Sequence, residues 1–411
     1  MANLPGGTGM GMGMIAAEIE RLDREDPFAG RRADFAIPAG VIYLDGNSLG
    51  PPTRWAAERL RSTVVEEWGG KLIHGWSECG WMELPNRLGD RIARLIGAGP
   101  GTVVVADSTS VNLMKALAAA LALQPFRSTI LTEEGAFPTD GYIAQGLCRF
   151  MDRTRRVKAV RAEAIEAALN EDTAVLLLTE TCYRTARRHD MARLTARAHA
   201  VGALTVWDLA HSAGAHPIDV TAARADFAVG CGYKYLNGGP GAPAFIYVAP
   251  EHANAPAIIP GWMGHAAPFA FETAYRPAAG AARMRAGTPD ILSMRALEAG
   301  LDAFEGVDLE ALRAKTMRLG DLFIAGVGER PGLTLLSPRE GALRGGHVAY
   351  AHPRARETLD ALARRGVIAD FRPPNVLRFG FAALYLSHRD VAEASQILRA
   401  VLSDLEDSSA A

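Results

Sequence analysis

Cysteine is scarce in this sequence: only four of the 411 residues are Cys, and they are Cys79, Cys148, Cys182 and Cys231. Four widely separated cysteines are too few for a disulfide framework, and no two of them have the close spacing of a metal-ligand pair. Free thiols are typical of a reducing compartment. The sequence therefore predicts a cytoplasmic protein without a metal site.

An excess of charge of one sign is also missing, because 44 basic side chains are balanced by 46 acidic ones and the formal net charge is −2. Nucleic-acid binding is disfavoured, since a polyanion needs a basic surface. The longest purely apolar run, Ala116–Leu123, is far shorter than the roughly 20 residues that cross a bilayer, so we expect no membrane span. The Gly-Met repeats around residues 11–14 lack the basic start and long apolar centre of a secretory signal, and we expect a floppy leader there.

What the sequence does have is the composition of a large globular protein, with 49% hydrophobic and 22% charged residues. Its length exceeds the usual size of a single core, which favours one large and one smaller domain. Short apolar runs separated by helical lengths are typical of an α/β protein with a mostly parallel sheet covered on both faces. These strand candidates are residues 103–106, 129–131, 174–179, 203–207, 227–229 and 244–248.

The pattern changes after Leu292 to long helices, at 297–304 and 309–324, followed by strand candidates at 347–351 and 376–379. We therefore predict three parts. They are an N-terminal segment (1–52) that packs with the small domain, a large domain (53–295) and a small α+β C-terminal domain (296–411). The last residues, Asp404–Ala411, are expected to be frayed.

The first candidate for chemistry is Asp208, because ligands of open parallel sheets bind at the carboxyl ends of the strands. Asp208 ends the apolar run 203–207, and His211 follows three residues later. A carboxylate in such a place holds a nearby ring nitrogen protonated, as pyridoxal 5′-phosphate (PLP) requires of its pyridine nitrogen. The alternatives are a helix cap for Asp208 and a structural role for His211.

The second candidate is Lys234, which lies inside the glycine-rich loop 230–241 at the end of the next strand. Glycines let the backbone approach a ligand closely. The neighbours Tyr233 and Tyr235 partly desolvate the amine, which lowers its pKa and makes it more nucleophilic. A solvated surface lysine needs none of these features, so Lys234 together with Asp208 indicates a PLP lysine.

Two further motifs fit a bound phosphate and a flat ring. The sequence Asp107-Ser108-Thr109-Ser110 begins a helix whose free N–H groups favour a phosphate, although an ordinary N-cap is the simpler alternative. Phe137, in Phe-Pro-Thr-Asp, is suited to stack on a cofactor, unless it is a core side chain. A dinucleotide fingerprint and a phosphate loop ending in Gly-Lys-Ser/Thr are both absent, which disfavours redox and ATP-dependent enzymes.

Taken together, these residues resemble those of one family, kynureninase, over nearly the whole chain. The most specific part is the run Gly-Tyr-Lys-Tyr-Leu-Asn-Gly-Gly-Pro-Gly. The similar segments are Tyr43–Gly50, Asp107–Asn112, Phe137–Asp140, Trp207–Gly214, Gly230–Gly241, Gly261–His265, Tyr275–Pro277, Gly287–Pro289 and Arg378–Phe379.

The resemblance implies the aminotransferase-like fold of PLP enzymes (fold type I), with a mostly parallel seven-stranded sheet. It implies that Lys234 binds PLP covalently, that Asp208 pairs with the pyridine nitrogen and that Phe137 stacks on the ring. The phosphate would be held by Thr109, Ser110 and Tyr233. Other positions around the cofactor match as well: Pro138, Thr139, Asp140, Thr179 and His211. Trp262 and Thr288 match phosphate contacts that the family supplies from the neighbouring subunit, which implies a homodimer.

The implied reaction is hydrolytic cleavage of L-kynurenine, or its 3-hydroxy form, to an anthranilate and L-alanine, a step of tryptophan catabolism. Lys234 would move the α-proton, and Tyr233 is the candidate acid that protonates the fragment left after cleavage. Arg378 resembles the anchor of the substrate carboxylate, a task that suits a forked guanidinium. Candidates for the pocket around the aryl ketone are Ser48, His74 and Trp76.

The chain departs from the family pattern after the apolar run 174–178. The family usually reads Thr-His-Val-Asn/Asp-Tyr/Phe-Arg-Thr-Gly, where this chain has Thr-Glu-Thr-Cys-Tyr-Arg-Thr-Ala, so Glu180 and Cys182 are changed positions bordering the cofactor. Asp290 also stands where an uncharged residue is usual. Both departures bear on the substrate rather than on the cofactor.

Two alternatives remain open. Another PLP enzyme on the same scaffold, such as a cysteine desulfurase or a class V aminotransferase, would also use Lys234 and Asp208, although no cysteine is placed convincingly as the mobile one of a desulfurase. A catalytically silent relative would have lost the lysine or the aspartate, and both are present.

Overall fold

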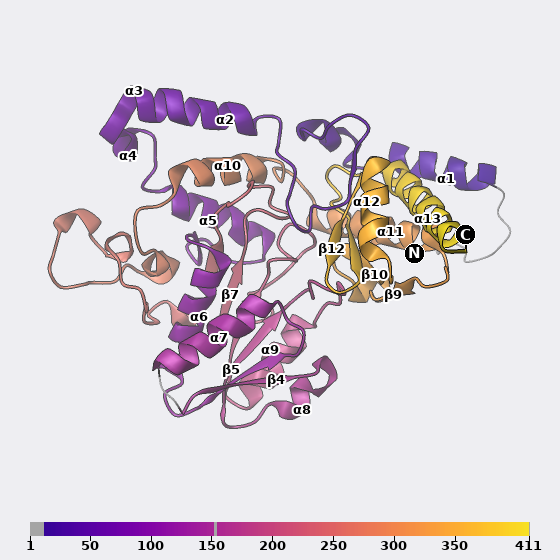
Figure 1. Ribbon diagram of the computed structural model, residues 1–411. Coiled ribbons are helices and arrows are strands. Elements are labelled where there is room, and N and C mark those ends of the chain that lie inside the picture. The colour runs from indigo at the N-terminus through magenta and orange to yellow at the C-terminus, as the bar shows by residue number, and fades with distance from the viewer. Residues whose placement is uncertain (1–11, 152–153, 411) are drawn as a thin grey trace. The chain divides into compact units, whose positions relative to one another are not determined.

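The computed structural model describes residues 12–151 and 154–410 (Figure 1). The chain divides into two compact units. The large unit comprises residues 55–183 and 188–305, and the small unit comprises 184–187, 306–411 and the residues up to 54, as far as they are described. The domain limits expected from sequence, after residues 52 and 295, differ slightly from these, and the second lies inside helix α10 (Ile291–Asp302).

A seven-stranded sheet forms the centre of the large unit, in the order β2-β8-β7-β6-β5-β3-β4. Strand β8 runs antiparallel to both its neighbours, and the other pairs are parallel. The predicted α/β fold with a mostly parallel sheet is therefore confirmed. The strands are β2 (Val103–Val105), β3 (Thr129–Glu133), β4 (Arg156–Val160), β5 (Thr173–Thr179), β6 (Leu204–Asp208), β7 (Phe227–Gly230) and β8 (Phe245–Val248).

Helices connect the strands of the large unit. Helix α6 packs against β5 to β8, and its apolar side chains join those of the strands in one buried cluster. This arrangement leaves the carboxyl ends of the parallel strands as the edge from which the connecting loops emerge. The helices are α2 (Ala56–Ser62), the π-helix η2 (Thr63–Trp68), α3 (Gly69–Lys71), α4 (Gly75–Glu78), α5 (Leu84–Leu95), α6 (Thr109–Leu123), α7 (Pro138–Met151), α8 (Ile165–Ala168), α9 (Met191–Ala200) and α10.

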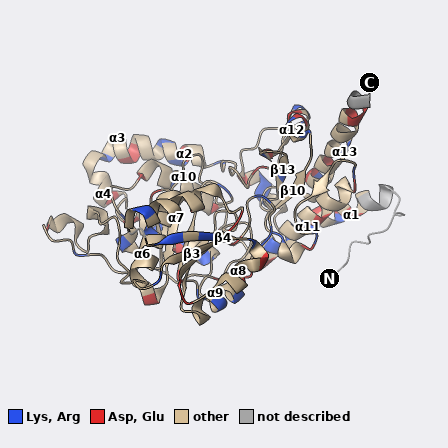
Figure 2. Ribbon diagram, turned by 60° about the horizontal axis from the view of Figure 1, so that its bottom comes forward, with Lys and Arg blue, Asp and Glu red and all other residues tan. Residues whose placement is uncertain are grey.

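The edge strand β4 is not predicted by the sequence pattern, because much of it is exposed and it has no buried apolar run. It carries Arg156 and Lys158 and is the blue strand in Figure 2. Basic side chains on an edge strand discourage pairing with the edge of another sheet. These exposed basic residues protect the edge, and they are also the reason why the strand has no hydrophobic pattern in the sequence.

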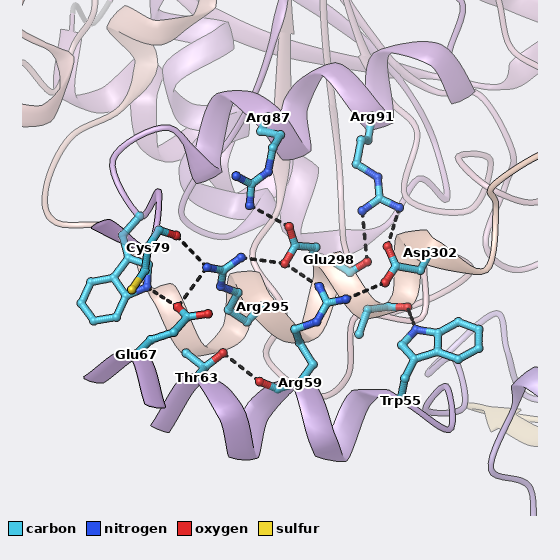
Figure 3. Close-up of polar contacts among 12 residues, drawn as sticks. Trp55, Arg59, Thr63, Glu67, Cys79, Arg87, Arg91, Arg295, Glu298 and Asp302 are labelled. Atoms are coloured by element: carbon cyan, nitrogen blue, oxygen red, sulfur yellow. Dashed lines mark hydrogen bonds and ion pairs between the residues drawn. The ribbon is translucent and has the colours of Figure 1, made fainter. Parts of the chain in front are cut away.

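An ionic network holds the segment 56–78, which we call the arm, against α5 and α10 (Figure 3). Glu298 of α10 accepts hydrogen bonds from Arg59 (2.7 Å), Arg87 (2.7 Å) and Arg295 (2.8 Å). A buried carboxylate is tolerated when such partners compensate its charge. The network thus fixes the side of the arm that faces α10.

The small unit contains a four-stranded antiparallel sheet, β12-β13-β10-β9, and a parallel pair, β1-β11. Helix α13 packs against α1, α11 and α12. Asp23 of α1 accepts the backbone N–H groups of His388 (2.7 Å) and Arg389 (3.1 Å), and so caps α13. The elements are α1 (Met12–Arg24), β1 (Ile42–Tyr43), α11 (Leu309–Val327), β9 (Thr334–Leu335), β10 (His347–Ala351), α12 (Ala355–Arg364), β11 (Val367–Ile368), β12 (Asp370–Arg372), β13 (Val376–Gly380) and α13 (His388–Ala410).

Both ends of the chain differ from the expectation. Helix α1 begins at Met12, so residues 12–14 of the expected leader are helical, and residues 1–11 lie outside the described part. The predicted fraying of 404–411 is wrong for 404–410, which continue α13, while Ala411 lies outside the described part. Two bonds help to hold this end of the helix: Arg354 donates to the carbonyl of Leu405 (2.7 Å), and Arg365 donates to Asp404 (2.5 Å).

All four cysteines are free thiols, as predicted. Across residues 12–151 and 154–410, we find no helix that combines the length and the apolar character needed to cross a membrane.

Candidate active site

The carboxyl ends of β6 and β7 bring Asp208, His211 and Lys234 together. Asp208 is the last residue of β6, is 4% exposed, and accepts the N–H of Ala210 (2.7 Å). Lys234 follows β7, and its Nζ lies 3.5 Å from Nδ1 of His211. Burial raises the pKa of Asp208, and the Lys234 ammonium opposes this rise. The three side chains, predicted from two separate segments, thus lie together in one group of charged and polar residues.

A second buried carboxylate, Asp140 of α7, joins this group. Thr179, at the end of β5, donates a hydrogen bond to Oδ2 of Asp140 (3.3 Å). Burial raises the pKa of Asp140 well above its usual value, and repulsion from Asp208 raises it further. Among the described residues, Lys234 is the cation whose charge acts on both carboxylates. The cluster would therefore stabilise an additional positive charge placed beside it.

Phe137 is not the core side chain that the simpler alternative describes, because it is 41% exposed. Its ring meets Tyr183 edge to face, with 5.3 Å between centroids, and Tyr183 lies 6.5 Å from the ring of His211. Pro138 and Thr139 follow as the first residues of α7, where proline's fixed φ suits a helix start. Phe137 is therefore an accessible aromatic side chain, and the ring of Tyr183 contacts it and lies near His211.

The glycines of the loop 230–241 allow parts of its backbone to lie close together. The N–H of Gly238 donates to the carbonyl of Gly232 (2.9 Å), and a Cβ on Gly238 would lie 2.7 Å from that oxygen. A Cβ on Gly232 would lie 2.5 Å from the carbonyl of Pro243. The structure thus explains these glycines by backbone packing within the loop, whereas the sequence suggested approach to a ligand. In the same loop, Nζ of Lys234 lies 5.6 Å from the centre of the Tyr233 ring.

Thr109 and Ser110 form the first turn of α6, and Ser108 is the N-cap, whose Oγ accepts the N–H of Val111 (3.4 Å). The first N–H groups of a helix have no partner within it, and the helix dipole favours an anion there. The cap and a phosphate site are compatible, because the cap occupies only one of these N–H groups.

Lys115 was missed by sequence reasoning. It is 1% exposed, forms an ion pair with Asp107, and donates to the carbonyl of Met284 (2.6 Å). Asp107 has a φ of +48°, a conformation that most side chains avoid. The ion pair therefore stabilises the tight turn that leads into α6. The available signal was that Lys115 is the charged residue in an otherwise uncharged helix, 109–123.

Thr288 and Trp262 lie on accessible parts of the large unit. Thr288 lines a cavity of about 340 Å³ together with Ser108 and Arg285. Trp262, in the short helix η6 (Trp262–Gly264), is 40% exposed and packs edge to face on Phe269, at 5.9 Å. Both side chains are thus accessible to another molecule.

Ser48 and Arg378 come together within the small unit. Arg378 of β13 is fully buried, and it donates from Nε to Asp370 (2.7 Å) and from Nη2 to Ser48 Oγ (3.0 Å). Burial alone would raise the pKa of Asp370, but the hydrogen bonds and the charge of Arg378 hold it below its usual value. Sequence reasoning missed Asp370, which fixes the orientation of the guanidinium.

His74 and Trp76 lie near the end of the arm. His74 is exposed, and Trp76 packs edge to face on Trp81, with 5.6 Å between centroids. The same arm carries exposed apolar side chains, which are Val64, Val65, Trp68, Leu72 and Ile73.

The departures from the family pattern have different structural settings. Asp290 is the N-cap of α10, and it accepts the N–H (3.4 Å) and the Oγ hydrogen (2.9 Å) of Ser293. Helix capping therefore accounts for a side chain with acceptor oxygens at this position. Glu180 is 2% exposed and lies in a polar cluster beside Ser212 and Arg188. Nothing in the structure explains Cys182.

Comparison with known proteins identifies the family. A model of the kynureninase C-terminal domain matches residues 312–398. A kynureninase of Deinococcus radiodurans is 50% identical over 399 residues, which cover 95% of this chain and 97% of that protein. The chain belongs to the kynureninase family. Kynureninases of Pseudomonas fluorescens and Burkholderia pseudomallei are each 48% identical, over 93% and 94% of this chain and 94% and 95% of their own.

Solved structures confirm the predicted fold. The cysteine desulfurase CsdA of Escherichia coli has a TM-score of 0.74 at 19% identity, covering 91% of this chain and 98% of its own. The cysteine desulfurase of Thermococcus onnurineus also has a TM-score of 0.74 at 19% identity, covering 92% and 98%. At such identity the likeness concerns the fold alone. Membership of the kynureninase family confirms the predicted enzyme class, a PLP-dependent hydrolase acting on carbon–carbon bonds.

Proposed function

We propose that this chain cleaves L-kynurenine, 3-hydroxy-L-kynurenine or both by hydrolysis, giving anthranilate or 3-hydroxyanthranilate and L-alanine. The observation that carries the proposal is the 50% identity to a kynureninase over nearly the full length of both chains. The cluster of Lys234 with Asp208 and His211 supports it, because it gathers a nucleophilic amine and a buried carboxylate at the edge of the sheet where ligands bind.

PLP fits this cluster, because two buried carboxylates with raised pKa values would gain from the protonated pyridine nitrogen of the coenzyme. PLP supplies an electron sink for the electron pair released at the α-carbon of an amino acid. In our proposal Lys234 holds the coenzyme and moves the α-proton, and the carboxylate of Asp208 keeps the proton on the ring nitrogen. Tyr233 donates the last proton to the alanine fragment.

The remaining cofactor positions follow the same proposal. Phe137 offers its exposed ring as a platform for the coenzyme, and the first turn of α6 offers N–H groups to the phosphate. The residues assigned to the coenzyme are Thr109, Ser110, Phe137, Pro138, Thr139, Asp140, Thr179, Asp208, His211, Tyr233, Lys234, Trp262 and Thr288. Substrate binding is assigned to Arg378 for the carboxylate and to Ser48, His74 and Trp76 for the aryl ketone.

We also propose a homodimer in which Trp262 and Thr288 serve the neighbouring subunit. The exposed apolar side chains of the arm support this, because large exposed apolar patches mark contact surfaces. Mixing Lys234→Ala subunits with Thr288→Ala subunits tests it. Shared sites would restore part of the activity in mixed dimers, whereas a monomer by sedimentation would contradict the proposal. For localisation, the free thiols support the cytoplasm.

The activity is tested by incubating the PLP-loaded protein with L-kynurenine and with 3-hydroxy-L-kynurenine and following the fluorescence of the anthranilate formed. L-Cysteine serves as the control substrate, since a desulfurase on this scaffold would release sulfide from it. Borohydride reduction followed by peptide mapping should place the coenzyme on Lys234. No product with either kynurenine would overturn the substrate, and a label on another residue would overturn the site.

A further inference from the structure

Glu180, which stands where the family pattern has histidine, is the centre of a polar cluster just beyond β5. One of its oxygens, Oε2, accepts hydrogen bonds from Thr181 Oγ1 (2.6 Å) and Ser212 Oγ (2.5 Å). Nε2 of His216 lies 3.3 Å from the same oxygen. The other oxygen, Oε1, accepts Nε of Arg188 (2.9 Å). Both oxygens are therefore bound, one of them to a permanent cation.

This cluster is buried, so its charges act strongly on one another. Thr181, Ser212 and His216 are almost inaccessible, and Arg188 is partly exposed. Burial alone would raise the pKa of Glu180, but the His216 ring and the Arg188 guanidinium outweigh it and hold the pKa well below its usual value. Glu180 is therefore a stable buried anion rather than a neutral acid.

The same residue is bonded to both ends of the segment 208–212. Its backbone N–H donates to the carbonyl of Asp208 (2.9 Å), and its side chain accepts the hydroxyl of Ser212. Between these two bonds lie the carboxylate of Asp208 and the ring of His211, whose Nδ1 is 3.5 Å from Nζ of Lys234. A change in the side chain of Glu180 would therefore act on this turn directly.

We propose that Glu180 is a positioning residue: its buried carboxylate ties the end of β5 to the turn after β6 and so holds Asp208 and His211 in the orientation that receives the coenzyme. The inference rests on the proposed function in taking these two side chains as coenzyme contacts. It does not depend on which amino acid is the substrate. The departure from the family pattern is thus a change in how the turn is held, with the Arg188 guanidinium as the compensating charge and the His216 ring as a further partner of the carboxylate.

The test compares Glu180→Gln with Asp226→Asn in the full-length protein. Asp226 is a matched control, since it is also a buried carboxylate that accepts from two histidines, His199 and His252 (2.8 Å each). It precedes β7 at the opposite end of the strands from Lys234. Apoprotein is titrated with PLP, and the dissociation constant is read from the protein fluorescence, together with the visible circular dichroism of the bound coenzyme and the apoprotein Tm.

Glu180→Gln is expected to weaken PLP binding about tenfold and to change the circular dichroism, because it removes a charge-assisted bond to the turn. Asp226→Asn is expected to lower the apoprotein Tm at least as much but to leave the PLP dissociation constant within about twofold. Equal loss of PLP affinity in both variants, or unchanged affinity in Glu180→Gln, would overturn the proposal.

Ser212→Ala provides a second route if Glu180→Gln does not fold, because it removes the hydroxyl bond and keeps the buried ion pair. A loss of PLP affinity of about threefold is expected for it, and unchanged affinity and circular dichroism would count against the proposal. These titrations contain no kynurenine. A protein that fails to cleave kynurenine would therefore leave this result standing, and the two proposals fail separately.

Discussion

The two edges of the central sheet bury carboxylates in different ways. At the amino edge, Asp226 accepts hydrogen bonds from His199 and His252, and also from the N–H (2.8 Å) and the hydroxyl (2.9 Å) of Thr205. These bonds hold the pKa of Asp226 well below its usual value in spite of burial. All four of these hydrogen bonds come from the chain itself.

At the carboxyl edge, Asp140 and Asp208 have raised pKa values, and Lys234 alone acts on both among the described residues. Their charges are not compensated to the same degree as that of Asp226. Groups with such raised values gather where a ligand is to be bound. Glu180, also at the carboxyl edge, has a lowered pKa as Asp226 does. The contrast is therefore between Asp226, which contributes stability, and the pair Asp140 and Asp208, whose buried charges we propose the coenzyme stabilises.

The largest effect is expected for Lys234→Ala, at the carboxyl ends of the parallel strands. Loss of the amine should lower kynurenine turnover at least about 1,000-fold, because covalent attachment and proton transfer both depend on it. The apoprotein Tm should also fall, because the buried carboxylates of Asp140 and Asp208 lose the cation that acts on both. Anthranilate fluorescence and thermal unfolding measure the two quantities. Lys158→Ala, on the exposed edge strand β4, is the control and should behave as the unaltered protein.

Asp208→Asn should show a second difference between the carboxylates at the two ends of the strands. Turnover is expected to fall about 100-fold, because the ring nitrogen loses its anionic partner. The apoprotein should become more stable at pH 7 by about 1 kcal/mol, since a buried carboxyl with a raised pKa favours unfolding as pH rises above the range of a free carboxyl, near 4. Urea unfolding of the apoprotein should show that this gain is larger at pH 7 than at pH 4.5. An apoprotein that is destabilised equally at both values would remove the contrast between the edges.

Asp226→Asn should give the opposite result, a loss of about 2 kcal/mol in the free energy of unfolding with turnover within twofold of the original. The folded pKa of Asp226 is lowered, so its contribution is present above the pKa of the unfolded chain, near 4, and disappears as pH falls through the folded pKa. Urea unfolding should therefore find the difference between the variant and the original smaller at pH 3.5 than at pH 7. A tenfold loss of turnover would assign this edge a role in the reaction.

The smallest effect is expected for Asp290→Ala. Removal of the α10 cap should cost about 1 kcal/mol, and the KM for kynurenine should stay the same. Thermal unfolding and steady-state kinetics measure these effects, with Asp290→Asn as the variant that keeps the cap. A raised KM in both variants would show that this departure concerns the substrate after all.

The strands and the residues that follow them were predictable, because apolar runs mark the strands and parallel strands end at one edge. Asp208 and Lys234 could therefore be paired from sequence, and the structure places both with His211. The partners of Glu180 could not be predicted, since Arg188 and His216 belong to loops whose packing depends on the whole unit.

Other differences also come from tertiary contacts. Lys115 is buried within an apolar helix because Asp107 compensates its charge. The sequence indicated the start of this helix but not the buried lysine. Strand β4 is largely exposed, as is usual for a protected edge strand, and so it lacks the apolar run by which the other strands were predicted. The last turns of α13 are bonded to Arg354 and Arg365, which are distant in sequence, and local composition cannot indicate such bonds.

The reversed strand β8 has a consequence for the order of folding. It pairs with β7, which leads into the lysine loop, and with β2, which leads into α6, and the second pairing joins Val103 to Tyr247 across a long stretch of chain. Closing so large a loop is slow, because the chain loses conformational entropy before the contacts between the two strands can form. We therefore expect the two proposed anchors of the coenzyme, the lysine loop and the first turn of α6, to become neighbours late in folding, so that coenzyme binding would report the completion of the large unit rather than guide its first steps.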